Sequence, residues 1–229
     1  MLAANVLAGC VEVWRLDLIH GDAAKAERLL TQDEQERAAR IGSRDARVAF
    51  VLTRAALRQR LGGYLDADPH SIRFEFNDHG KPRLSGTEEN QGLVFSVSHS
   101  GTVALLAFAR DLALGVDTER LRTRRGLDDL ASHCLNDAEL ESWLMIPDAG
   151  RLEAFIRYWV CKEAFVKATG RGIALGLKQV EVREDFRGFL RLPEGWGPAD
   201  NWSLHEWGDE GQRCAVVHSG PKQTIQVLK

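Results

Sequence analysis

The chain is poor in the residues that mark secreted, membrane-spanning and zinc-finger proteins. Its 229 residues include four cysteines, scattered at positions 10, 134, 161 and 214 with no C-x-x-C pair. This spacing excludes a disulfide framework and a cysteine-based zinc site. The apolar run at residues 103–109 is far shorter than the roughly 20 residues that a membrane-spanning helix needs. We therefore expect a cytoplasmic protein with reduced thiols and no membrane partner.

The sequence also lacks a large excess of charge of either sign. Thirty Lys and Arg residues stand against 33 Asp and Glu residues, a formal charge of -3. This balance argues against a nucleic-acid partner, because such binding relies on a basic surface. Hydrophobic residues make up 44% and charged residues 28% of the chain, as in globular proteins. The length allows one large domain or two small ones, at about 100–200 residues per domain.

Hydrophobic patterning predicts helices and short strands in both halves of the chain. Strands are expected at residues 11–19, 72–76, 93–97, 103–110, 112–118, 180–183, 202–207, 214–218 and 224–228. Helices are expected at residues 32–41, 45–61, 126–135, 137–145 and 151–169. We expect Gly62 and Gly63 to end the second of these helices, Gly170 and Gly172 to end the last, and Arg110-Asp111 to form a tight hairpin turn.

Asp117 and Glu119 form an acidic pair at the end of the strand expected at residues 112–118. Because side chains alternate between the two faces of a strand, both carboxylates point the same way. They repel each other unless a cation or a proton lies between them. Two carboxylates with positions left open for phosphate are typical of a Mg²⁺ site. Two solvent-exposed acids would give the same pattern.

The helix expected at residues 151–169 carries a second candidate. Trp159, Glu163 and Lys167 are spaced by four, so they line one stripe of the helix. Apolar neighbours such as Phe155 and Phe165 would exclude water from this acid and base, which strengthens their electrostatic interactions. The alternative is an ordinary Glu–Lys pair on a helix surface, worth about 0.2–0.5 kcal/mol.

Three further segments could bind an anionic ligand. The cluster Ser98-His99-Ser100-Gly101 lies between two apolar strands, and its hydroxyls, imidazole and backbone N–H groups suit a phosphate. The turn His79-Gly80-Lys81-Pro82 presents a lysine. Between Arg40 and Arg60, six arginines stand against one acid, a local charge of +5 (6 - 1). A polar turn or a solvated face would explain each of these segments when it is taken alone.

The candidate segments follow one another in a distinctive order. They are the helix with Arg47 and Arg54, then Gly80-Lys81-Pro82, Ser98-His99-Ser100-Gly101, Asp117-x-Glu119, and finally Trp159-x-x-Lys162-Glu163-Ala164-x-x-Lys167. In this order they resemble the 4′-phosphopantetheinyl transferases, and in particular the Sfp-type branch of that family. The resemblance covers roughly residues 30–185. One departure is Val160, where the family often has a small hydroxyl residue.

The resemblance implies an enzyme that moves the 4′-phosphopantetheine arm of coenzyme A onto a serine of an apo acyl or peptidyl carrier protein and releases 3′,5′-ADP. It implies Mg²⁺, replaceable by Mn²⁺, and coenzyme A as co-substrate. The implied fold is mixed α+β (α/β), with two similar lobes related by pseudo-two-fold symmetry. Each lobe has a small, mostly antiparallel sheet and a long helix, and the active site lies in the cleft between them. We expect lobes at residues 1–115 and 116–229, and a monomer, because a chain with both lobes builds its own cleft.

Phosphopantetheine transfer needs charge neutralisation and a base for the serine proton. The resemblance implies that Asp117, Glu119 and Glu163 hold the metal. Glu163, or a metal-bound water that it orients, would take the proton. Lys167 would neutralise charge on the transferred phosphate. Coenzyme A would be bound by Ser98 and His99 at its phosphate oxygens, and by Lys81, Arg47 and Arg54 at its 3′-phosphate and adenine end.

Two other functions remain open from the residues alone. One is a metal-dependent phosphohydrolase that cleaves nucleotides or coenzyme A with the same three acids. The other is a non-catalytic module that binds coenzyme A. Carrier proteins of the transferase family are generally acidic around the modified serine, so we expect the basic segment 120–125 to dock the carrier.

Overall fold

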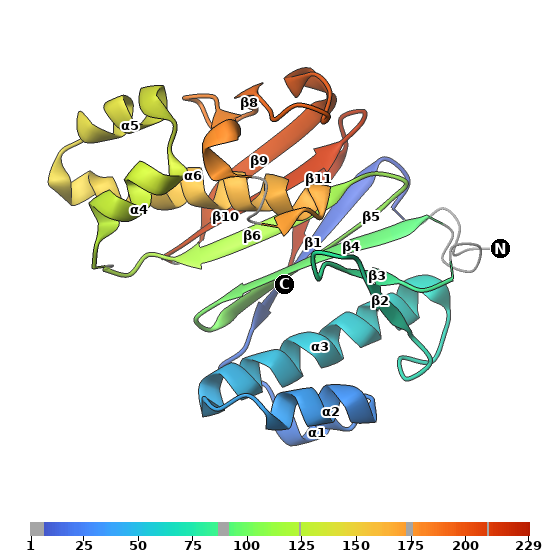
Figure 1. The fold of residues 1–229 in the computed structure, drawn as a ribbon. Helices are drawn as coiled ribbons and strands as arrows, with labels where there is room; N and C mark the ends of the chain where they lie inside the picture. Colours follow the sequence, from blue (N-terminus) through green and yellow to red (C-terminus); the bar gives the residue numbers. More distant parts are fainter. Residues whose placement is uncertain (1–6, 87–91, 124, 173–175, 210) are drawn as a thin grey trace.

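Two main β-sheets and two long helices build the molecule (Figure 1). The computed structural model describes residues 7–86, 92–123, 125–172, 176–209 and 211–229. The helices are α1 (Ala23–Glu27), α2 (Gln32–Ala39), α3 (Arg44–Leu65), α4 (Leu127–Cys134), α5 (Asp137–Leu144) and α6 (Asp148–Thr169). The strands are β1 (Cys10–Asp17), β2 (Phe74–Phe76), β3 (Pro82–Leu84), β4 (Leu93–Ser100), β5 (Val103–Arg110), β6 (Leu114–Arg120), β7 (Glu181–Val182), β8 (Phe189–Arg191), β9 (Trp202–Asp209), β10 (Gln212–Ser219) and β11 (Thr224–Leu228).

The first sheet has the strand order β11-β1-β5-β4 and the second has the order β6-β10-β9. Strands pair antiparallel in both sheets, except that β1 and β11 are parallel. The ribbons β2–β3 and β7–β8 lie outside these two sheets. The predicted architecture of small, mostly antiparallel sheets with long helices is therefore confirmed. The pseudo-two-fold relation between the halves stays a prediction.

The core is layered in the order α3, first sheet, second sheet, α6. On β5, Leu106 and Phe108 pack with Leu57 and Leu61 of α3, while the odd-numbered residues 103–109 pack between the two sheets. On the outer face of the second sheet, β9 and β10 share one apolar cluster with α6. Figure 1 shows α3 and α6 on opposite sides of the sheets. Because β5 is covered on both faces, it reads as a continuous apolar run instead of an alternating one.

The prediction that Gly62 and Gly63 end the helix that begins near residue 45 is wrong. α3 continues to Leu65, and Asp66 closes it in the left-handed conformation with φ of 52°. A Cβ at position 62 would lie 2.7 Å from the carbonyl oxygen of Ala67, so the loop that follows α3 approaches too closely for any other residue. Tertiary packing explains this glycine and overrides its low helix propensity.

The prediction of a tight hairpin at Arg110-Asp111 is also wrong. Asp111 is a left-handed turn residue with φ of 55°, but the strand after it joins the other sheet. β5 pairs with β1 and β4, whereas β6 pairs with β10. The partner of β6 lies almost 100 residues further along the chain, and local turn chemistry does not encode such a partner.

The last strand returns to the first half of the molecule. β11 lies beside β1 at the edge of the first sheet, and the boundary predicted between residues 115 and 116 falls inside β6. The division into lobes at 1–115 and 116–229 therefore stays a prediction. Across the described ranges, no helix combines the length and the apolarity needed to cross a bilayer.

Candidate active site

The site begins with an unusually close contact between α6 and β6. A Cβ at Gly115 on β6 would lie 1.9 Å from the carbonyl oxygen of Ala164 and 2.4 Å from the backbone nitrogen of Ala168, both on α6. Only glycine therefore lets this helix lie directly on the strand. The contact brings the α6 turn that carries Glu163 and Lys167 next to Asp117, two residues after the glycine.

A lysine and a serine hold Asp117 in place. The Lys167 ammonium donates hydrogen bonds to Asp117 Oδ1 at 2.7 Å and to Ser98 Oγ at 2.8 Å. The Ser98 hydroxyl donates to the same Asp117 oxygen at 2.7 Å. Asp117 is buried, and this burial raises the pKa of its carboxyl against the lowering effect of Lys167 and Ser98. Strand β4, strand β6 and helix α6 thus converge on one carboxylate.

Glu163 belongs to the same electrostatic cluster. Burial, followed by the negative charges of Asp117 and Glu119, raises the pKa of its carboxyl from 4.5 to about 7 against the lowering effect of Lys167. Glu119 accepts a hydrogen bond from the Ser100 hydroxyl at 2.8 Å. One ammonium group, on Lys167, therefore faces three carboxylates in this cluster, an arrangement that favours an additional cation or a proton.

Two buried carboxylate oxygens support an additional cation. Within the described ranges, Asp117 Oδ2 and Glu163 Oε1 are buried and accept no hydrogen bond. Buried acceptors are costly to leave unsatisfied, and carboxylate oxygens are the donors that Mg²⁺ prefers. The side chains present therefore fit a hard divalent cation. They are not already arranged as ligands, because the described residues contain no group of three or more His, Cys, Asp and Glu placed to hold a metal. Asp117, Glu119 and Glu163 as a metal-binding trio stay a prediction.

His99 and Ser98, the two residues predicted to bind phosphate oxygens, differ in their exposure to solvent. His99 is an exposed residue whose imidazole is partly withdrawn from water. This desolvation and the nearby Lys167 ammonium lower the pKa of the imidazole, while Glu119 raises it. Its neighbour Ser98 is buried and has given its one hydroxyl hydrogen to Asp117. His99 can therefore donate to a phosphate oxygen in this arrangement, whereas Ser98 would first have to leave Asp117.

Lys81 lies close to the cluster. Its ammonium donates to the carbonyl oxygens of Leu114 at 3.0 Å and Ala168 at 3.2 Å, and burial lowers its pKa to about 8. Lys81 and Lys167 both line a cavity of about 230 Å³ between the 79–82 turn, β4 and the end of α6. The predicted turn lysine and the predicted helix lysine therefore share one cavity.

The two predicted arginines lie elsewhere. Arg47 is exposed and donates to the carbonyl oxygen of Ile41 at 3.0 Å. Arg54 lies over the ring of Phe74 at 4.8 Å and 3.6 Å from Glu34, and burial lowers the pKa of its guanidinium. It lines a separate cavity of about 470 Å³, and neither arginine lines the Lys81 cavity. Their role at the 3′-phosphate and adenine end stays a prediction.

Lys162, the other charged residue of the helix motif, has a structural position. Its side chain is fully buried and its ammonium donates to Glu139 Oε2 at 2.5 Å and to the carbonyl oxygens of Leu177 and Val180. Glu139 in turn accepts from the backbone N–H of Val182 at 2.9 Å. This ion pair fastens α5 and residues 177–182 to α6, on which Glu163 and Lys167 lie.

The sequence places Ser100 in a candidate phosphate-binding cluster but does not predict its contact with Glu119. A signal for this contact was present, because serines at 96, 98 and 100 alternate along β4 and so lie on one side of it. The hydroxyl groups reach Asp117 and Glu119 only because β4 and β6 lie next to each other. The predicted hairpin places the strand at 112–118 beside the strand at 103–110 instead.

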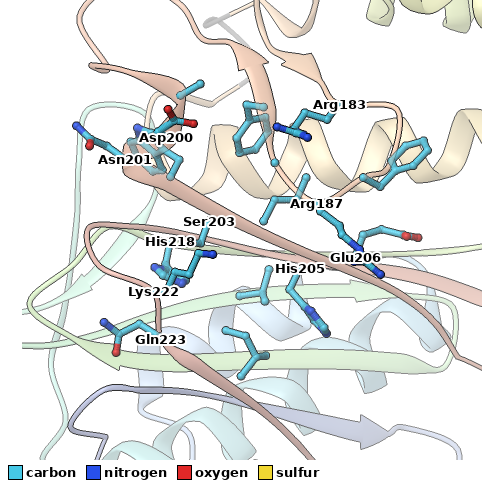
Figure 2. Close-up of a pocket in the computed structure, with 18 of the residues that line it drawn as sticks. Arg183, Arg187, Asp200, Asn201, Ser203, His205, Glu206, His218, Lys222 and Gln223 are labelled. Carbon is cyan, nitrogen blue, oxygen red and sulfur yellow. The ribbon is translucent and has the colours of Figure 1, made fainter.

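A further large cavity is not part of this cluster. It measures about 1040 Å³ and lies along β9 and β10, with Arg187, His205 and Glu206 toward one side and His218 and Lys222 toward the other (Figure 2). No predicted site residue lines it. Several of its charges are paired, among them Arg157 with Glu206 at 2.9 Å and Arg183 with Asp185 at 3.4 Å.

Comparison with known proteins matches both halves of the chain. Residues 113–217 match the family model described as the 4′-phosphopantetheinyl transferase superfamily, and residues 19–110 match that of the 4′-phosphopantetheinyl transferase N-terminal region. The chain is 36% identical to the 4′-phosphopantetheinyl transferase HetI of Nostoc sp. over 78% of this chain and 76% of that protein. It is 24% identical to the 4′-phosphopantetheinyl transferase Sfp of Bacillus subtilis over 84% of this chain and 83% of that protein.

Proposed function

Since the chain belongs to the 4′-phosphopantetheinyl transferase family, we propose that it transfers 4′-phosphopantetheine from coenzyme A to a serine of an apo acyl or peptidyl carrier protein and releases 3′,5′-ADP. The serine oxygen forms a bond to the β-phosphorus of coenzyme A, and the bond from that phosphorus to the bridging oxygen breaks. The observation that carries the proposal is the Asp117–Glu163–Lys167 cluster, with its two unpaired buried carboxylate oxygens.

Glu163 is the proposed base. Burial and the charges of Asp117 and Glu119 raise its pKa to about 7 in the absence of a cation. A cation beside it would lower this pKa, so the carboxylate would be ionised and able to accept a proton at neutral pH. The carboxylate takes the serine proton directly or orients a water that does so. Glu163 lies one helical turn before Lys167, so the group that takes the proton and the group that receives the phosphate charge lie on one face of α6.

Lys167 and His99 are the proposed groups for the reacting phosphates. The Lys167 ammonium, held by Asp117 and Ser98, is positioned in advance and so needs little reorganisation as negative charge develops. A divalent cation, Mg²⁺ or Mn²⁺, when bound by Asp117, Glu119 and Glu163, supplies further charge neutralisation to the pyrophosphate. Lys81 is proposed to meet the nucleotide end from the cavity that it shares with Lys167.

The proposed carrier-docking surface is the basic segment that follows Glu119. Arg120, Arg122 and Arg125 are exposed, and Arg124 lies outside the described residues. Arg120 ends β6 and Arg122 and Arg125 follow it, so positive charge follows Glu119 directly along the chain. An acidic carrier protein would be attracted there, with an interaction that salt weakens.

We further propose that one chain forms a complete site. Ser98 on β4 of the first sheet and Asp117 on β6 of the second are joined by a hydrogen bond, and α6 adds Glu163 and Lys167. Because both sheets of one chain contribute, a monomer suffices. The cytoplasmic location expected from the scattered cysteines stays a prediction.

One assay tests the proposed function against its rivals. The purified chain is incubated with coenzyme A, MgCl₂ and an apo carrier protein, and the intact mass of the carrier is measured. A gain of one phosphopantetheine on the carrier serine supports the transferase. Breakdown of coenzyme A without carrier modification would point to a phosphohydrolase, and binding of coenzyme A without any reaction would point to a non-catalytic module.

A pair of variants assigns the chemistry within that assay. We expect Glu163→Gln to abolish transfer, because glutamine neither takes a proton nor neutralises a cation. The matched control is Glu153→Gln, an exposed acid on the same helix that pairs with Arg213 at 3.4 Å. Transfer by Glu163→Gln at the rate of the Glu153→Gln control would refute the role of Glu163.

A further inference from the structure

Strands β4 and β6 are joined by serine side chains instead of a backbone ladder. The hydroxyl oxygens of Ser96, Ser98 and Ser100 accept hydrogen bonds from the backbone N–H groups of residues 116, 118 and 120 at 3.0, 3.3 and 3.2 Å. Both sets of residues advance by two, so the strands run parallel here. We call these three serines the serine seam. It connects an edge of the first sheet to an edge of the second.

Two members of the serine seam have a second partner. Ser98 donates to Asp117 Oδ1 at 2.7 Å, and Ser100 donates to Glu119 Oε2 at 2.8 Å. A hydroxyl has one hydrogen, and in these two serines it is directed at the carboxylate that precedes the bound N–H group. Hydrogen bonds to an ionised carboxylate are shorter and stronger than neutral ones. Ser96, by contrast, accepts from Val116, and no carboxylate occupies the equivalent position because residue 115 is glycine.

We propose that Ser100 is a positioning residue that keeps the Glu119 carboxylate on the same side of β6 as Asp117, within reach of the divalent cation. The proposal rests on the proposed function, which assigns Glu119 to the cation. Ser100 acts through Glu119 and does not touch the reacting atoms. Glutamate has more rotatable bonds than aspartate, so its carboxylate gains more from being held before the cation arrives. Asp117 is less dependent on the serine seam, because Lys167 also holds it.

The serine seam also ties the orientation of the carboxylates to the relative position of the two sheets. The same Ser100 oxygen binds the backbone of β6 and orients a side chain of β6, while its own backbone belongs to β4. A shift of one sheet past the other would therefore turn Glu119 away. This coupling follows from hydrogen bonds that join the two sheets at the place where the cation is proposed to bind.

Binding of Mn²⁺ by the full chain tests the proposal, with coenzyme A present and free Mn²⁺ followed by electron paramagnetic resonance. In Ser100→Ala we expect the Mn²⁺ dissociation constant to rise at least about fivefold, because a hydrogen bond to a charged group is lost. The matched control is Ser96→Ala, which removes a serine-seam bond to the backbone but no carboxylate contact. We expect its Mn²⁺ affinity to stay within about twofold of wild type, since only a neutral bond to the backbone N–H of Val116 is lost and no carboxylate loses a partner. Ser100→Thr keeps the hydroxyl on a strand that tolerates β-branched residues, so it should restore Mn²⁺ binding.

The outcomes separate this proposal from the one on which it depends. Unchanged Mn²⁺ affinity in Ser100→Ala would overturn the role of Ser100 while leaving the cation site intact. Equal weakening in Ser96→Ala and Ser100→Ala would also overturn it, because the serine seam would then act only on the fold. If the wild-type chain binds no Mn²⁺, the cation site itself fails, and the role of Ser100 fails with it. Thermal unfolding of each variant shows whether it is folded under the conditions of the titration.

Discussion

Replacing Glu163 by glutamine should stabilise the metal-free protein at alkaline pH while it abolishes transfer. The pKa of Glu163 is raised from 4.5 to about 7 by burial and by the charges of Asp117 and Glu119. The folded state therefore binds this proton more tightly than the unfolded state does. Stability from this group is fully present below about pH 4.5 and is lost as the pH rises to 7. One pKa unit corresponds to about 1.4 kcal/mol, so at pH 8 the ionised Glu163 costs the metal-free protein up to about 3 kcal/mol.

The assay is urea unfolding in the presence of a chelator at pH 5 and pH 8. The wild-type free energy of unfolding should fall between these two values by more than that of Glu163→Gln, since glutamine carries no charge at either pH. At pH 8 the variant should be the more stable protein. Addition of Mg²⁺ and coenzyme A at pH 8 should stabilise the wild type and have much less effect on the variant, because a ligand stabilises only the state that binds it.

One result would refute this reasoning. If wild type, Glu163→Gln and the Glu153→Gln control lose stability in parallel between pH 5 and pH 8, Glu163 is not held in an unfavourable ionised state. The carboxylate cluster would then lack the charge imbalance that favours a cation, even if the variant were inactive for another reason.

Three further predictions follow from contacts around the cluster. Lys162→Ala should lower the free energy of unfolding by about 3–5 kcal/mol in urea titrations, because it leaves Glu139 buried without its partner. A loss below about 1 kcal/mol would contradict the structural role given to this pair. Gly115→Ala should lower the melting temperature and the transfer rate together, because its Cβ would overlap the backbone of α6, whereas Gly63→Ala, with open space around the new Cβ, should be tolerated. The apparent affinity for an acidic carrier protein should fall as the NaCl concentration rises, and neutral substitutions in the basic segment 120–125 should make the affinity less dependent on NaCl. An affinity that does not change with NaCl would show that this segment is not the docking surface.

Much of the fold follows from local sequence patterns, and the predictions that were wrong share one kind of cause. The strands at 103–110 and 224–228 were predicted with the observed bounds, because hydrophobic runs bounded by turn residues encode a strand locally. The end of α3 was wrong because Gly62 serves a contact with residue 67. The hairpin at 110–111 was wrong because β6 finds its partner in β10. Local sequence indicates where elements lie, but it does not indicate which distant segments they meet.

The candidate site shows the same division. That Asp117 and Glu119 lie on one side of β6, and Glu163 and Lys167 on one face of α6, follows from the periods of strand and helix. The structure adds that Lys167 bonds to Asp117. By contrast, the role of Arg54 is implied only by the resemblance, and its position in a separate cavity depends on how α2 and α3 pack. The period of a helix or strand predicts which residues share one side of that element. A site also depends on how far apart the elements lie, which the period does not give.

The most direct test of the account is a crystal structure of the chain with coenzyme A and Mn²⁺, with data collected for the anomalous signal of the metal. The account predicts a single anomalous peak within coordination distance of Asp117, Glu119 and Glu163, next to the pyrophosphate. A peak bound by other side chains, or a pyrophosphate held by Lys167 and His99 with no metal near these three carboxylates, would contradict it.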